Sequence, residues 1–242
     1  GNSITTGASN TAVGRCSLVE NTTGEGNTAV GIQALEDTTT GAYNVAVGAN
    51  AGLLHTTGGN NVFVGDSAGR QNTTGCKNTG LGSGALYGAG GSGTVMQDNA
   101  AVGYRSLYTN TTGNSNAAFG NNTLYANTTG CINTAIGKDA LGLTTTGQQN
   151  TALGAAAGYN VTTGDNNVLI GRNAGRSSSP ATITTGDNNI VLGNNTHTNA
   201  YIKIDWTVTS DLRDKTNIEP IPHGLNFINQ ITPIKYNFKK SR

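Results

Sequence analysis

The sequence has few of the residues on which compact globular cores depend. Aromatic residues make up 5% of its 242 residues, charged residues make up 11%, and there is one tryptophan. A domain of this length ordinarily uses more large apolar side chains and more charge. A single compact globule is therefore not the expected fold.

Several partner and activity classes also lack support. The net charge of +1 gives no reason to expect nucleic acid or an acidic membrane surface as a partner. No stretch approaches the ~20 apolar residues that span a bilayer, and no secretion signal opens the chain. There is no phosphate loop, zinc cluster or Ser-His-Asp arrangement. We therefore predict no cofactor and no turnover of an external substrate.

The three cysteines, Cys16, Cys76 and Cys131, cannot all pair within one chain. Cys76 and Cys131 hold equivalent places three repeats apart, which at ~4.8 Å per repeat exceeds the reach of a disulfide. We interpret all three as reduced packing residues, and they leave the cellular compartment open.

What the sequence does contain is a repeat. An asparagine recurs every seventeen residues, with gaps of 21 after Asn78 and 22 after Asn167. The longer gaps indicate loop insertions, Gly-rich around Gly88 to Gly93 and Ser-rich around Ser177 to Pro180. The repeat asparagines are Asn10, Asn27, Asn44, Asn61, Asn78, Asn99, Asn116, Asn133, Asn150, Asn167 and Asn189.

Two further features recur at fixed places in the repeat. Glycine always stands four residues after the asparagine, preceded by an aliphatic or aromatic residue, as in Val13-Gly14. Thr-Thr-Gly follows later in nine of the ten complete repeats and is missing only from the one that begins at Asn78. The repeat element Thr-Thr-Gly already occurs at Thr5 to Gly7, so we expect the N-terminus to be a cut through a longer protein.

A seventeen-residue period is typical of one turn of a β-solenoid. The run N-T-A-V-G supplies a strand, and each strand stacks on its counterpart ~4.8 Å away. The glycine permits a bend that a Cβ would oppose, and the asparagines can form a ladder of side-chain amides. We predict an all-β parallel β-solenoid, or β-roll, of about eleven coils.

Strand alternation predicts an assembly. The first and third residues after each asparagine share one face, and the second, nearly always small, faces the other way. One large aliphatic residue per coil makes a thin core for a lone solenoid. We therefore expect the alanine side to be an inter-chain face, with identical rods packed as a homotrimer.

The composition changes near residue 203. Half of the fourteen Lys and Arg residues and three of the four prolines lie beyond it, whereas Gly224 is the only glycine after Gly193. We predict a solenoid over residues 1–200, a connecting strand over 201–210, and a small α+β segment over 211–242. In that segment Leu225, Ile228 and Ile231 fit one helical face.

Two resemblances refine these predictions. The repeat, with its N-x-x-V-G element, resembles the head domains of trimeric autotransporter adhesins, which are left-handed parallel β-rolls. That resemblance implies left-handed, trimeric coils, although the adhesin repeat is usually shorter and lacks Thr-Thr-Gly. The longer repeat looks more like that of tail-fibre-like proteins of viruses and bacteria.

The C-terminal run S-D-L-R-D-K-T-N-I-E-P-I resembles the start of the self-cleaving intramolecular chaperone domain of phage tail fibres and endosialidases. The resemblance implies autoproteolysis between Ser210 and Asp211, with Lys215 as the partner of the serine. A desolvated lysine can activate serine, but attack on its own carbonyl would close a strained ring. A neighbouring chain's serine or an activated water is easier, and the route stays open. Only 32 residues follow Ser210, so we expect the chaperone domain to be truncated in this chain.

Three surface features each allow two interpretations. Tyr87, Tyr108 and Tyr125 occupy one place in successive coils and Tyr159 recurs there, which indicates either a glycan-binding row or a packing ladder. The threonine rows fit ice binding or, more plainly, turn hydrogen bonding. Asp165 and Asp187 stack in adjacent coils, as weak calcium ligands or as solvated turn residues.

These patterns favour a structural, receptor-binding fibre of a virus, phage tail or injection particle, matured by autocleavage. Its expected partners are its own copies, a host surface receptor such as a glycan, and an upstream fibre or baseplate segment. It would lie on the surface of a virion or extracellular particle. The alternatives are a bacterial cell-surface adhesin, a self-cleaving unit whose rod is a passive carrier, and an ice- or glycan-binding solenoid.

Overall fold

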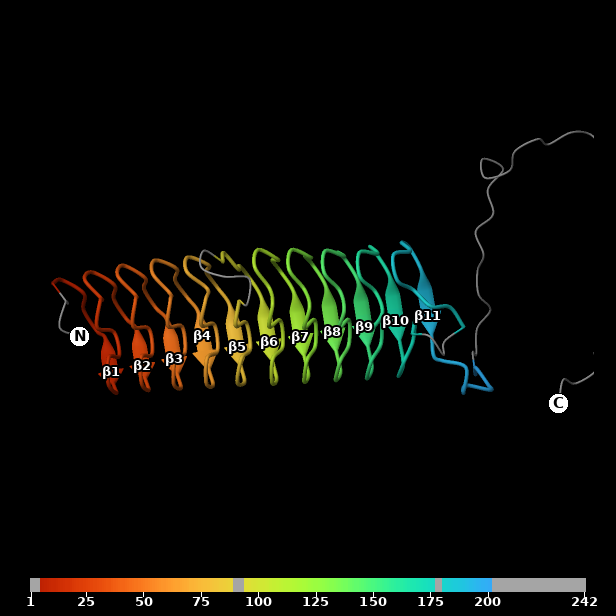
Figure 1. The fold of residues 1–242 in the computed structure, drawn as a ribbon, viewed down its shortest axis with the longest axis horizontal. Helices are drawn as coiled ribbons and strands as arrows, with labels where there is room; N and C mark the ends of the chain where they lie inside the picture. The colour runs from red at the N-terminus through yellow and green to blue at the C-terminus, as the bar shows by residue number, and fades with distance from the viewer. Residues whose placement is uncertain (1–4, 89–93, 177–179, 202–242) are drawn as a thin grey trace, which may run out of the picture. The chain divides into compact units, whose positions relative to one another are not determined.

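The computed structural model describes residues 5–88, 94–176 and 180–201. The chain divides into two units, residues 1–199 and 200–242. The first unit contains eleven three-residue strands, which lie side by side in the order of the sequence (Figure 1). They are β1 (Thr11–Val13), β2 (Thr28–Val30), β3 (Val45–Val47), β4 (Val62–Val64), β5 (Thr79–Leu81), β6 (Ala100–Val102), β7 (Ala117–Phe119), β8 (Thr134–Ile136), β9 (Thr151–Leu153), β10 (Val168–Ile170) and β11 (Ile190–Leu192).

The strands form one parallel sheet in which each pairs only with its sequence neighbours. Equivalent repeat positions are partners, as in Ala12 with Ala29. The register also continues across both insertions, where Thr79 pairs with Ala100 and Val168 with Ile190. The predicted parallel β-solenoid is therefore confirmed, and the insertions leave its ladder intact.

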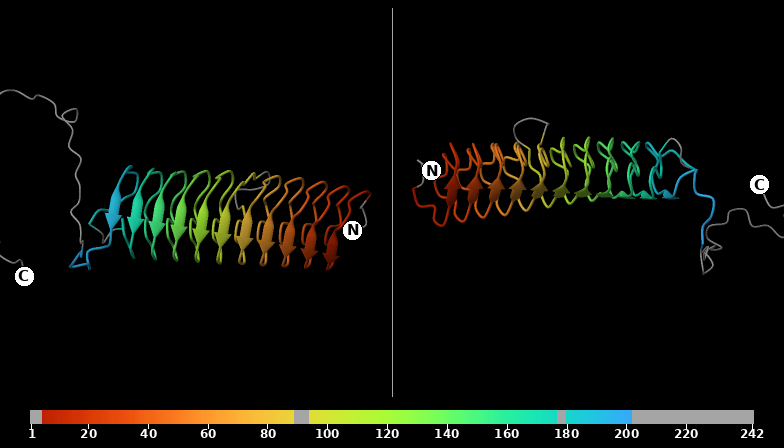
Figure 2. Two further views of the ribbon diagram at one scale, coloured as in Figure 1. Left: turned by 180° about the vertical axis from the view of Figure 1, so that it is seen from behind. Right: turned by 90° about the horizontal axis from the view of Figure 1, so that it is seen from below.

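The coils are stacked with the sheet on one side and the turns on the other (Figure 2). The number of complete coils is slightly lower than the eleven expected, because β11 is followed by no complete coil among the described residues. The turns stack as regularly as the strands: the Leu18 amide, for example, donates to the Ala34 carbonyl one coil away. The α+β segment predicted for residues 211–242 lies outside the described residues.

The prediction about the two faces of each strand is wrong. The small second residue, such as Ala29, Ala46 or Ala118, is fully buried inside the coil. The large third residue points outward and is 36–57% exposed in every strand except β2 and β6, where Val30 and Val102 are half-buried. The alanine side is thus the solenoid's own core, because the opposite wall of so narrow a coil leaves room only for small side chains.

The rest of the core comes from a turn segment that faces the sheet. Seven and eight residues after the asparagine of each complete coil lie a small residue (alanine, serine or threonine) and then a leucine or glycine; Ala34 and Leu35, for example, are both fully buried. The leucine adopts a left-handed backbone, with φ of 50° at Leu35 and 51° at Leu107. Such a conformation is costly for a branched side chain, so burial of the leucine must offset it.

The predicted asparagine ladder is confirmed. The side-chain Oδ1 of Asn116 accepts from the backbone amide of Asn133 at 3.0 Å and from its Nδ2 at 3.2 Å. The Nδ2 of Asn116 donates to the Gly130 carbonyl at 2.9 Å. The same pattern recurs along the solenoid, so one buried side chain per coil satisfies the backbone of two turns.

Glycine is required four residues after each asparagine. From Gly14 to Gly171 its φ lies between 109° and 142°, a region that is closed to other residues. A Cβ on Gly14 would also lie 2.3 Å from the Gly31 carbonyl oxygen in the next coil. The predicted role of this glycine is confirmed, and the close stacking of coils is its second cause.

Candidate ligand-binding surface

One row of side chains runs along the coils on the turn side of the sheet. It lies nine residues after each repeat asparagine, so every member comes from an equivalent turn. From the fourth coil to the tenth the row reads Arg70, Tyr87, Tyr108, Tyr125, Gly142, Tyr159 and Arg176. We call this series the tyrosine row.

The first three tyrosines stack face to face. The ring centroids of Tyr87 and Tyr108 lie 4.8 Å apart with planes 14° apart, and those of Tyr108 and Tyr125 lie 5.4 Å apart at 4°. These spacings match the coil pitch of a parallel sheet, ~4.8 Å. The solenoid itself therefore sets the stacking, and each ring is half-buried by its neighbours.

Arginines flank the row and lie over its rings. The Arg70 guanidinium is 5.8 Å from the Tyr87 ring centroid and donates to the Tyr87 hydroxyl at 3.2 Å. At the other end the Arg176 guanidinium is 4.6 Å from the Tyr159 ring. Contacts of this kind stabilise partly exposed rings by about 0.5–1 kcal/mol.

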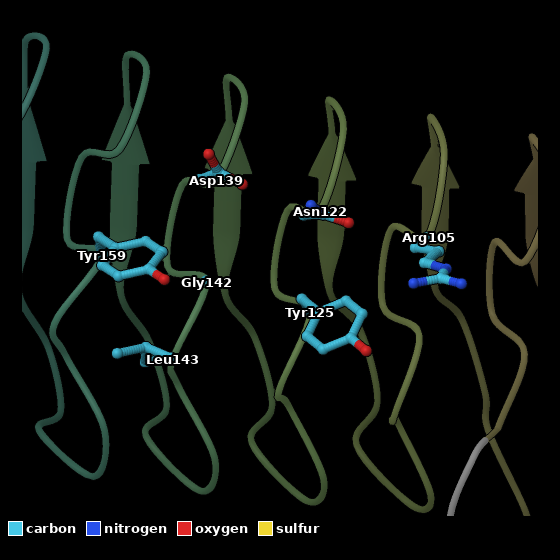
Figure 3. Close-up of a pocket in the computed structure, with 7 residues that line it drawn as sticks. All are labelled: Arg105, Asn122, Tyr125, Asp139, Gly142, Leu143 and Tyr159. Atoms are coloured by element: carbon cyan, nitrogen blue, oxygen red, sulfur yellow. The ribbon is translucent and has the colours of Figure 1, made fainter.

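The row is broken at Gly142, where a tyrosine would otherwise stand. Tyr159 therefore does not continue the stack, and a pocket of about 310 Å³ opens between it and Tyr125 (Figure 3). We call this pocket the slot. It is lined by Arg105, Asn122, Tyr125, Asp139, Gly142, Leu143 and Tyr159.

A smaller pocket lies beside the stacked part of the row. It measures about 140 Å³ and combines the edges of Tyr87 and Tyr108 with Asp66, Ser67 and Ser83. Because Tyr87 and Tyr108 stack directly, no ring can enter between them. The two pockets thus differ in kind, and only the slot is bounded by separated aromatic rings.

A second surface lies on the outer face of the sheet. The third residue of every strand contributes a large apolar side chain there, and β-sheet register aligns these residues in a continuous line. We call this line the apolar stripe. It comprises Val13, Val30, Val47, Val64, Leu81, Val102, Phe119, Ile136, Leu153, Ile170 and Leu192.

The threonine and aspartate positions serve the turns. The Thr22 hydroxyl donates to the Thr39 carbonyl at 3.0 Å, and the first threonine of the other Thr-Thr-Gly turns repeats this bond along the coils. The Asp187 carboxylate accepts from the Asp165 amide at 2.7 Å, and the Asp165 carboxylate accepts from the Gln148 amide at 2.7 Å. Within the described residues no three His, Cys, Asp or Glu side chains gather as metal ligands.

Cys16, Cys76 and Cys131 form no disulfide within the described residues and are half-exposed. Cys76 and Cys131 occupy the same turn position as the two aspartates, and the Sγ of each accepts a backbone N–H from the preceding coil at 3.4 Å. The predicted cleavage residues Ser210, Asp211 and Lys215 lie outside the described residues. Among those same residues, no helix has the length and apolar character that crossing a membrane requires.

Sequence reasoning found Tyr87, Tyr108, Tyr125 and Tyr159 but missed the slot between the last two. The signal was present, because Gly142 occupies the tyrosine position in the intervening coil. It also missed Arg105, Asn122 and Asp139, which share another repeat position, six residues after the asparagine. Reading every position down the coils, rather than each motif along the chain, would have placed these residues together.

Comparison with known proteins adds one finding at the end of the chain. Residues 210–242 match the family described as Peptidase_S74, chaperone of endosialidase. No curated protein and no solved structure matches the chain. A parallel β-solenoid followed by the start of this chaperone family fits a tail-fibre-like protein.

Proposed function

We propose that this chain is part of a homotrimeric attachment fibre whose solenoids pack through the apolar stripe and whose C-terminal chaperone is removed by autocleavage. The observation that supports this proposal best is the apolar stripe. It runs over eleven strands, so at ~4.8 Å per step this line of apolar side chains is roughly 50 Å long. Monomeric proteins rarely expose a contiguous apolar patch of more than a few hundred Å², and the largest patch on a protein is often functional.

The stripe fits a second copy of the same chain. Its spacing is fixed by the coil pitch, so an identical solenoid presents side chains at the same intervals and the two surfaces are complementary along their whole length. Only uncharged side chains occur among the outward residues of the strands, and charge depletion is typical of interface cores. The match to the endosialidase chaperone family supports a fibre over a cell-surface adhesin.

The native mass of the 24.6 kDa chain tests the assembly. Light scattering or native mass spectrometry should give about three times that mass, because three solenoids can close around one axis and cover every stripe. A folded monomer at micromolar concentration would contradict the proposal.

Maturation is tested separately on the gene product that carries the complete chaperone domain. We expect wild-type protein to give a fragment that begins at Asp211, whereas Ser210→Ala and Lys215→Ala stay intact because the nucleophile or its base is missing. Thr209→Ala is the matched control and should still cleave. Cleavage of Ser210→Ala at the same bond would contradict the proposed autocleavage but not the proposed trimeric fibre.

A further inference from the structure

The break in the tyrosine row at Gly142 is the one place where the regular surface opens. We propose that the slot is a carbohydrate-binding subsite that takes one sugar ring between Tyr125 and Tyr159. This deepens the proposed function, since it rests on a fibre that attaches to a surface and assigns the chemistry of that attachment.

The width of the slot fits one ring. Adjacent tyrosines stack at 4.8 and 5.4 Å, whereas the backbone positions of Tyr125 and Tyr159 are two coil steps apart, roughly 10 Å. The Tyr159 ring lies against Gly142 and so borders this gap on one side. A ring placed between two aromatic faces needs ~3.5–4 Å on each side. One ring fits the gap, and a stack of two does not.

The chemistry of the lining fits a sugar. The apolar C–H face of a pyranose can pack on a tyrosine ring, while its hydroxyls point to the rim. At the rim lie the Arg105 guanidinium, the Asn122 amide and the Asp139 carboxylate (Figure 3). These groups together donate and accept hydrogen bonds, which is what polyhydroxylated ligands require.

The walls of the slot are held in place before any ligand arrives. Tyr125 is stacked on Tyr108 at 5.4 Å, and Tyr159 lies between the Gly142 backbone and the Arg176 guanidinium. The Arg105 guanidinium is held 5.0 and 5.3 Å from the rings of Tyr104 and Tyr108. A preformed site loses little side-chain freedom on binding, which favours affinity.

The deciding variant is Gly142→Tyr, which completes the row and fills the slot. A Cβ at Gly142 would lie 2.9 Å from the Tyr159 ring, so the end of that side chain must shift while the backbone keeps its fold. The probe is a glycan array of neutral hexose, N-acetylhexosamine and sialylated chains, followed by saturation-transfer NMR of the whole chain with the strongest binder. We expect wild-type protein to bind, and Gly142→Tyr, Tyr125→Ala and Tyr159→Ala to lose at least tenfold in affinity.

Tyr43→Ala is the matched control, because Tyr43 is 57% exposed but lies outside the row, and it should bind as the wild type does. Circular dichroism melting of each variant separates loss of the slot from loss of the fold. The proposal is overturned if wild-type protein binds no glycan at millimolar concentration, or if folded Gly142→Tyr binds equally well. Native mass on the same samples keeps the two ideas apart: a trimer without glycan binding rejects the subsite alone, and a glycan-binding monomer rejects the fibre alone.

Discussion

At the scale of single residues, the solenoid depends on side chains that hydrogen-bond to the backbone of neighbouring turns. The repeat asparagines from Asn27 to Asn167 are buried; Asn116, for example, accepts from Asn133 of the next coil and donates to Asn99 of the preceding one. A buried backbone group that loses its partner costs about 1–3 kcal/mol. Asparagine is suited to this role because its short side chain both donates and accepts.

Asn116→Ala should therefore lower the free energy of unfolding by about 1–3 kcal/mol, since it leaves the Asn133 amide without its partner. The Gly130 carbonyl loses one of its two donors and keeps Asn127 Nδ2 at 3.0 Å. Asn114→Ala is the matched control two residues earlier in the chain, where the side chain accepts one exposed bond from the Gln97 amide at 3.0 Å. Urea unfolding of both variants checks this. Equal losses of unfolding free energy in the two variants would show that the asparagine ladder does not stabilise the solenoid as expected.

His55 replaces the asparagine that other coils use at a second buried position, such as Asn72. Its ring nitrogens lie 2.8 Å from the Asn72 carbonyl and 2.9 Å from the Gly58 carbonyl. Burial lowers the pKa of His55 from its ordinary value of 6.5, and the two backbone hydrogen bonds oppose that shift. The buried ring is thus held neutral, and it then donates to only one of the two carbonyls.

A lowered pKa in the folded state makes the unfolded chain bind more protons below pH 6.5. The stability that His55 contributes is therefore complete above that pH and is lost as the pH falls from there through the folded-state pKa. His55→Asn should remove this part of the pH dependence, because asparagine fits the same turn in the next coil. Urea midpoints of both proteins between pH 7.5 and 5 check this, and parallel curves would contradict it.

At the scale of elements, the inward strand residue and the turn residue that faces it vary inversely in size. Five of the ten complete coils have alanine at the inward strand position and leucine in the turn, whereas Phe63 in β4 faces Gly69 and Leu169 in β10 faces Gly175. A Cβ on Gly69 would lie 2.3 Å from the Phe63 ring. Gly52 and Gly158 stand opposite alanines of their own coils, but a Cβ there would lie 3.2 Å from the Phe63 ring and 2.6 Å from the Leu169 side chain of the next coil. Glycine thus replaces leucine where a large inward residue lies in the same coil or the next one.

This inverse variation in size predicts a rescue. Phe63→Ala should cost about 3–5 kcal/mol through the cavity it leaves, and Gly69→Leu alone should destabilise by overpacking. The double variant recreates the alanine and leucine pair found in other coils, such as Ala29 with Leu35, so its loss should be at least ~1 kcal/mol smaller than the sum of the single losses. Urea unfolding of the four proteins gives this coupling.

A distant pair provides the control for the rescue. Phe63→Ala combined with Gly158→Leu, which lies several coils away against Leu141 and Leu169, should show losses that simply add. A rescue that is equally large in both pairs would mean that leucine stabilises these turns regardless of what lies opposite.

At the scale of the whole molecule, the apolar stripe is the feature that a lone solenoid leaves unexplained. Ile136→Glu combined with Leu153→Glu, at positions 42% and 47% exposed, should shift the native mass from trimer toward monomer because charge in an interface core is not solvated. Each coil should keep its fold, since both side chains point away from its core. Native mass and circular dichroism together check this.

Ile132→Glu is the control for the stripe, because Ile132 is 57% exposed but lies outside the strands. We expect it to leave the mass unchanged. A trimer that persists in the double variant would place the interface on another face of the solenoid.

The sequence alone determined the period, and with it the parallel sheet, the coil boundaries and the asparagine ladder. Close stacking forces equivalent residues into contact, so these features had to appear as repetition. The free cysteines also followed, because Cys76 and Cys131 stand three coils apart.

Only the tertiary structure decided which face of each strand is the core. Alternation shows that Ala118 and Phe119 point in opposite directions, but it cannot say which direction is inward. That depends on the width of the coil, which is set by how the turn carrying Leu124 folds back on the sheet. The slot likewise depends on the tertiary structure. Gly142 leaves an open pocket only because Tyr125 and Tyr159 flank it in space.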